Sequence, residues 1–193
     1  TAIGWYALKV ASTASESTAI GAYAGQSITT GDQNTVMGYN AGGSLTTGGS
    51  NICIGAYALD AATTTSHNTA VGNAALSTAD SHYNTAVGSS AMQLTTTGDR
   101  NTACGYGTLY DNTTGAQNTA LGMSALENNT TASANTAVGY NCMTTNTTGS
   151  YNTAVGHQAL YANNASWNTA VGWNSLASNT TGYQNTAVGY NAL

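Results

Sequence analysis

The signature Asn-Thr-Ala-Val-Gly, with variations, recurs twelve times within the 193 residues of this chain. Successive signature glycines are separated by 17 residues in nine intervals and by 16 in the other two. The glycines are Gly4, Gly21, Gly38, Gly55, Gly72, Gly88, Gly105, Gly122, Gly139, Gly156, Gly172 and Gly189. A unit this short cannot bury its own apolar face, so each repeat has to be one coil of a solenoid. The repeat therefore predicts a single all-β domain over residues 1–193, a parallel β-solenoid of about 12 coils.

The repeat also gives a frame for every other position, which we count from the signature glycine as position 0. No change in composition marks a linker, and the chain starts and stops inside the repeat, so we expect it to be part of a longer protein. Lys9 and Arg100 are the only basic side chains, against seven acidic ones. Nucleic-acid binding needs clustered positive charge and is excluded on this composition. No apolar run approaches the roughly 20 residues that span a bilayer, which argues against membrane insertion.

Two positions are apolar in nearly every coil and predict two core columns. Position −1 follows the alternation of a short strand, with Thr at −3 on the same face and Ala at −2 on the other. Position +4 is Leu or Met except at Gly25 and Gly42. A coil of 17 residues at about 3.3 Å each encloses only a thin core. The predicted core residues are Ile20, Ile54, Val71, Val87, Leu121, Val138, Val155, Val171 and Val188 at −1, and Leu59, Leu76, Leu126, Leu160 and Leu176 at +4.

Asparagine at position −4 stands where the chain turns into the strand in ten coils. Asn tolerates turn conformations, and amides in register can hydrogen-bond from coil to coil. We therefore expect a structural ladder of Asn34, Asn51, Asn68, Asn84, Asn101, Asn118, Asn135, Asn152, Asn168 and Asn185.

The segment from +5 to −5 collects the charges and most of the variation, which is typical of exposed loops. It also contains six Asn-x-Ser/Thr sequons, at Asn112, Asn128, Asn129, Asn146, Asn164 and Asn179. Glycosylation there is one interpretation, since exposed loops accept glycans easily. The other is that Asn-Thr-Thr-Gly serves as a turn.

Aromatic residues gather just after the glycine, and at position +1 they form a candidate contact stripe of Tyr39, Tyr106, Tyr140, Trp173 and Tyr190. Flat rings with a polar edge suit sugars and protein interfaces. The simpler alternative is that the rings cover the glycine corner or pack between copies of the chain.

A catalytic or metal site is not indicated by the sequence. The histidines are His67, His82 and His157, and no acid forms a plausible constellation with them. His67 and His82 lie in neighbouring coils, but two imidazoles on a loop face are usually only solvated. We predict no catalytic residue, no metal and no cofactor. Cys53, Cys104 and Cys142 each replace a small apolar residue, and coil spacing places them too far apart for a disulfide.

Coils such as Asn152-Thr-Ala-Val-Gly-His-Gln-Ala-Leu160, followed by Asn179-Thr-Thr-Gly182, resemble the repeats of phage and bacterial tail-fibre-domain proteins. They are also similar to the head repeats of YadA-like trimeric autotransporter adhesins. The resemblance covers essentially the whole chain. It implies a left-handed, trimeric β-roll or β-helix outside the cell or on a virion, which serves as an adhesive or spacing element.

Three functions therefore remain open. The first is a structural segment of an extracellular fibre, either a surface adhesin or a phage tail fibre, which attaches to a host glycan or receptor. The second is a subunit that polymerises end to end into a filament or sheath, because its coils stack on their own kind. The third is an ice- or glycan-binding repeat face, which the Thr column at −3 invites if that column faces outward. An enzyme is not expected.

Overall fold

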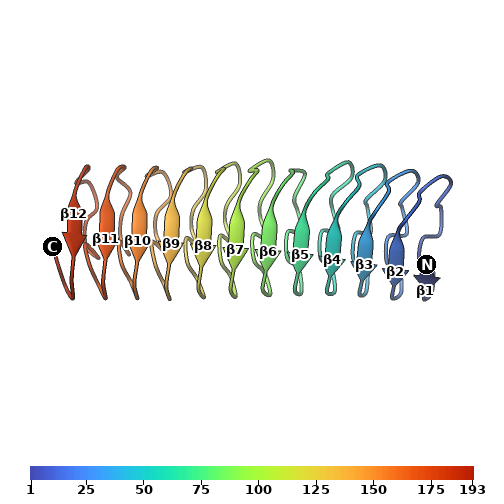
Figure 1. Cartoon of the computed structure of the whole chain (residues 1–193), viewed down its shortest axis with the longest axis horizontal. Coiled ribbons are helices and arrows are strands. Elements are labelled where there is room, and N and C mark those ends of the chain that lie inside the picture. The colour runs from blue at the N-terminus through green and yellow to red at the C-terminus, as the bar shows by residue number, and fades with distance from the viewer.

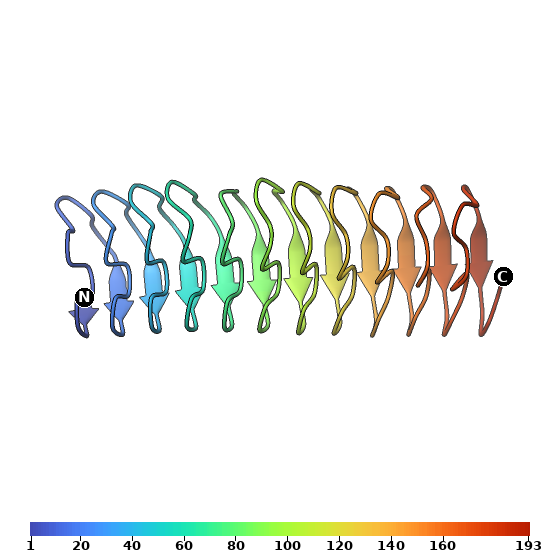
Figure 2. The same ribbon diagram turned by 180° about the vertical axis from the view of Figure 1, so that it is seen from behind.

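A computed structural model describes all residues 1–193 as a β-solenoid of about eleven turns (Figure 1). One short strand from each coil contributes to a single parallel sheet, in which the strands follow one another in chain order from β1 to β12. The strands are β1 (Ala2–Ile3), β2 (Thr18–Ile20), β3 (Thr35–Met37), β4 (Ile52–Ile54), β5 (Thr69–Val71), β6 (Thr85–Val87), β7 (Thr102–Cys104), β8 (Thr119–Leu121), β9 (Thr136–Val138), β10 (Thr153–Val155), β11 (Thr169–Val171) and β12 (Thr186–Val188). The two termini lie at opposite ends of the resulting rod (Figure 2).

Register between coils is the same along the whole rod, so that each signature residue faces its counterpart. Thr119, for example, pairs with Thr136, and Ala120 pairs with Ala137. Of 121 backbone hydrogen bonds, 100 lie outside the assigned strands. Backbone pairing therefore continues around the loops as well as through the sheet, which ties each coil to the next on every side.

The signature glycine forms a corner directly after each strand. At Gly122 the backbone has φ +126°, a conformation that side-chain-bearing residues rarely adopt. A Cβ built on Gly122 would lie 2.5 Å from the carbonyl oxygen of Gly139 in the next coil. Glycine is required there by both the dihedral angle and the close approach of neighbouring coils.

Position −2 faces the interior, and the prediction of position −1 as a core column is wrong. From β2 to β12 the −2 side chains, mostly alanine, are almost completely buried, whereas the −1 side chains lie on the outer surface of the sheet. Ile20, Ile54, Val71 and Val138 are half-buried, and Val87, Leu121, Val155, Val171 and Val188 are exposed. The coil is so thin that its wall of strands has room for a methyl group inward, so the larger apolar side chain of each strand is placed outward.

Position +4 supplies the bulk of the core, as the sequence predicts. Leu59, Leu76, Leu126 and Leu160 are fully buried, and Leu176 is 8% exposed. These leucines adopt an unusual left-handed backbone, with φ of 50° at Leu59 and 51° at Leu126. A long side chain from this wall fills the space that the alanines of the facing strand leave empty.

Candidate functional site

The asparagines of position −4 form a continuous buried ladder. In nine successive coils the backbone N–H of each asparagine donates to Oδ1 of the asparagine before it, at 2.8–3.0 Å. Asn118 shows the full pattern: its N–H donates to Asn101 Oδ1, its Oδ1 accepts from the Asn135 N–H, and its Nδ2 donates to the Ala132 carbonyl. Nearly every polar atom of the buried amide is thereby satisfied, so the role of this ladder is structural.

The ladder extends through the predicted set with two differences at its ends. Ser17 replaces asparagine before Asn34, and its hydroxyl accepts the Asn34 N–H at 3.1 Å. Asn185, at the other end, is exposed although its N–H still donates to Asn168 Oδ1.

A second asparagine ladder, at position +7, was missed by the sequence reasoning. Position +7 points inward beside the +4 column, and in the later coils it is occupied by Asn112, Asn129, Asn146, Asn163 and Asn179. Asn129 Nδ2 donates to Asn112 Oδ1 at 2.7 Å, and each member also donates to a carbonyl two or three residues further on. The signal was present in the sequence, because five asparagines share one phase of the repeat.

Three of the candidate glycosylation sites are corrected by this second ladder. Asn112, Asn129 and Asn146 have no exposed surface, and their amide nitrogens are committed to hydrogen bonds inside the coil. A glycan on any of them would have to pass through the core. Among the other sequons, Asn164 is exposed and Asn128 is half-buried. Asn179 is half-buried, but its Nδ2 donates to Asn163 and Gly182.

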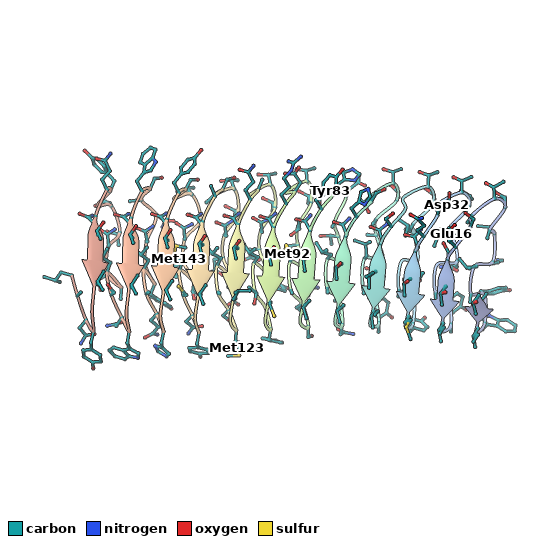
Figure 3. All side chains as sticks on the ribbon, viewed as in Figure 1. Glu16, Asp32, Tyr83, Met92, Met123 and Met143 are labelled. Carbon is teal, nitrogen blue, oxygen red and sulfur yellow. The ribbon has the colours of Figure 1, made fainter.

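The candidate contact stripe at +1 lies along one edge of the rod, the lower edge in Figure 3, where Met123 is labelled. All five predicted members, Tyr39, Tyr106, Tyr140, Trp173 and Tyr190, are exposed, by 42–73%. In the last four coils the rings form a continuous pile with centroid separations of 5.2, 5.8 and 4.7 Å, from Tyr140 through His157 and Trp173 to Tyr190. Because neighbouring rings cover one another's faces, the pile offers ring edges to a partner.

A shallow recess of about 260 Å³ interrupts the same edge at Gly107. The other coils carry a side chain at this position, such as Ser90 or Ser124. The recess is lined by Ser90, Tyr106, Gly107, Tyr110 and Glu127.

The opposite edge carries a shorter aromatic group at position −5. His67 stacks on Tyr83 at 5.2 Å, and Arg100 lies 5.7 Å from the same tyrosine ring. His82 accepts a hydrogen bond at Nδ1 from the Ser66 N–H at 3.0 Å. The two imidazoles therefore make separate stacking and turn contacts, and no group of three or more His, Cys, Asp or Glu side chains lies close enough to hold a metal ion.

The three cysteines are all unpaired and fall into two environments. Cys53 and Cys142 are buried, and burial raises the pKa of both thiols to about 12. Cys104, which was predicted as a buried small residue, occupies position −1 and is exposed on the outer surface of the sheet.

The structure contains no helix that is both long and apolar enough to cross a membrane. Comparison of the chain with protein-family models, curated proteins and solved structures gave no match.

Proposed function

We propose that this chain is a structural repeat segment of an extracellular fibre, a surface adhesin or a phage tail fibre, which works by attachment and display and not by catalysis. The observation that carries the proposal is the ladder of backbone and Asn hydrogen bonds, whose Asn part runs unbroken from Asn34 to Asn185. Such a ladder makes a stiff rod of about 53 Å from eleven intervals of about 4.8 Å. A rod that repeats the same strand on successive coils suits a spacer or a multivalent attachment element.

Side-by-side association of copies, as a left-handed homotrimer on a cell surface or virion, is part of this proposal. The aromatic edge at +1 is the surface we assign to it. Exposed Tyr and Trp are enriched at protein interfaces, and stacked rings lose little conformational freedom on binding.

The test is the mass of the protein in solution together with cryo-electron microscopy of the same sample. Three-chain particles support the fibre proposal, and a stable single chain at micromolar concentration contradicts it. Replacing Tyr140, Trp173 and Tyr190 by serine should release single chains, because it removes the rings assigned to the association. The variant should still fold, because Ser89 already occupies position +1 in another coil. The matched control replaces Tyr151 and Trp167 on the opposite edge, where Ser50 is the natural precedent.

An end-to-end polymer is the second candidate function. It is favoured by the identical register of every interval, because the coil of one copy could continue the ladder of another. Long filaments with the repeat of a single chain would support it. Closed particles at all concentrations would exclude it.

A further inference from the structure

The outer surface of the sheet runs along the whole rod, because every coil contributes one strand to it. We call it the Thr/Val face, and it consists of positions −3 and −1 of β2 to β12. Figure 1 shows the strands side by side in one row along the rod. Ten of the eleven −3 residues are threonine: Thr18, Thr35, Thr69, Thr85, Thr102, Thr119, Thr136, Thr153, Thr169 and Thr186. The −1 residues beside them are aliphatic, Met or Cys, so no charged side chain stands on the face.

The hydroxyls of the Thr/Val face have no partner in the protein. One column of threonines elsewhere in the coil does make such bonds: Thr96 Oγ1 donates to the Thr113 carbonyl and Thr113 Oγ1 to the Thr130 carbonyl, both at 2.9 Å. None of the −3 threonines makes such a bond, and all of them are half-buried or exposed. Each hydroxyl can therefore donate one hydrogen bond to water and accept others from it.

The threonines also repeat at a spacing that matches hydrogen-bonded water. Parallel strands are about 4.8 Å apart, so the hydroxyls recur at that distance along the rod. Two water oxygens bound at the tetrahedral angle to a third, each at about 2.75 Å, lie about 4.5 Å apart. The strand spacing and the water spacing differ by about 0.3 Å per interval. The four strands β9 to β12, which all read Thr-Ala-Val, contain three such intervals, so the mismatch across them is only about 0.9 Å. A row of hydroxyls held at this spacing can thus take the place of a row of ordered water molecules.

The face is also rigid enough to hold that spacing. Thr and Val are β-branched and have few side-chain rotamers. Their backbone is paired on both sides, as in the register of Thr153 with Thr136 and with Thr169. The valine methyl groups in the column beside the hydroxyls cannot hydrogen-bond to water. Water over them has to make its hydrogen bonds to other water molecules, within an ordered layer.

We propose that the Thr/Val face binds ice, with the threonine hydroxyls of β9 to β12 as its centre. A rigid, uncharged array with the repeat of tetrahedral water fits an ice surface, whereas liquid water does not hold that order. The inference does not depend on the fibre proposal, because it uses a different surface from the aromatic edge.

The experiment measures thermal hysteresis and ice-crystal shape for the purified protein. The wild type is expected to separate the freezing point from the melting point and to facet growing crystals. Replacing Thr153 and Thr169 by lysine should abolish both effects, while the same replacement at Thr131 and Thr148, exposed threonines outside the face, should preserve them. Circular dichroism and urea unfolding establish that both pairs of variants are folded.

A folded wild type with neither effect overturns the proposal, as does a Thr153/Thr169 variant with full activity. A second copy of the chain is the competing occupant of this face, and oxidation of the exposed Cys104 tests for it. A Cys104 to Cys104 crosslink formed at low protein concentration would mean that copies cover the face, and would count against ice binding. The mass in solution is read separately, so a monomeric protein with hysteresis refutes the fibre proposal alone.

Discussion

Ile28 fills the space that the absent side chain of Gly25 leaves in the core. A Cβ built on Gly25 would lie 2.8 Å from Ile28 Cδ1 and 3.3 Å from Val36 Cγ2. Gly42 repeats the relationship in the next coil, where Leu45 is buried at the position of Ile28 and Val36 again borders the gap. The two interruptions of the +4 column are therefore compensated by larger side chains at +7 and −2.

This exchange of volume predicts a coupled pair of substitutions. Gly25→Leu should destabilise the fold by about 1–3 kcal/mol, because the added side chain overpacks the core against Ile28. Adding Ile28→Ala should recover most of that loss, since Leu at +4 with Ala at +7 is the natural arrangement of Leu59 and Ala62. Urea unfolding of the two single variants and the double variant measures the coupling. Strictly additive effects would contradict it.

The inward direction of position −2 predicts that two adjacent substitutions lower the free energy of unfolding by very different amounts. Ala137→Asp places a charge in a fully buried site without a partner and should cost about 3–5 kcal/mol. Val138→Asp places the same charge on the outer surface and should change the free energy of unfolding by no more than about 1 kcal/mol. Thermal and urea unfolding of the two variants measure both changes in stability. Similar losses of stability in both variants would contradict the exposure of position −1 on the outer surface of the sheet.

The Asn ladder predicts a large effect from a single amide. Asn118→Ala removes the only partner of the Asn135 N–H. It also removes one of two donors to the Ala132 carbonyl, which still accepts from Asn129 Nδ2. Leaving the buried Asn135 N–H unsatisfied should cost about 1–3 kcal/mol. Thr114→Ala, on the exposed side of the same coil, serves as the control and should be nearly neutral. Hydrogen exchange should show the added opening in the coils on either side of Asn118, and unchanged protection there would be the contrary result.

Two glycines of the same edge are predicted to differ in their tolerance of a side chain. Gly122→Ala combines a strained φ with a clash against the Gly139 carbonyl and should cost about 3 kcal/mol or more. Gly107→Ser should be close to neutral, because a Cβ there meets only Ser124 Oγ at 4.0 Å and serine occupies the position in neighbouring coils. The stabilities of the two variants, compared with the wild type, check the assignment, and equal tolerance of both changes would refute it.

The thiol pKa values predict selective modification. A thiol with a pKa of about 12 has only about one part in ten thousand as thiolate at pH 8, and the thiolate is the reactive form. Reaction of the native protein with a thiol reagent at pH 8 should therefore modify Cys104 alone, and the denatured protein should react at all three cysteines. Rapid native labelling of Cys53 or Cys142, located by mass spectrometry, would show that the core opens.

The period of the signature glycines was enough to predict coils, parallel strands and a ladder at position −4. A strict 17-residue repeat leaves no other way to bury apolar surface, and in-register asparagines leave few other partners for their amides. Strand alternation likewise placed Thr136 and Val138 on one face and Ala137 on the other. These conclusions depend only on spacing along the chain.

Only the tertiary structure decided which face points inward. The sequence reasoning assumed that Val138, the larger apolar side chain, would be buried, but the width of the coil permits only Ala137 beside the leucines of the facing wall. The same closure brings Asn129 inside although it belongs to a sequon, because position +7 is turned toward the +4 column. Inside and outside depend on the cross-section of the closed coil, which is set by contacts between distant parts of each repeat and not by local residue preferences.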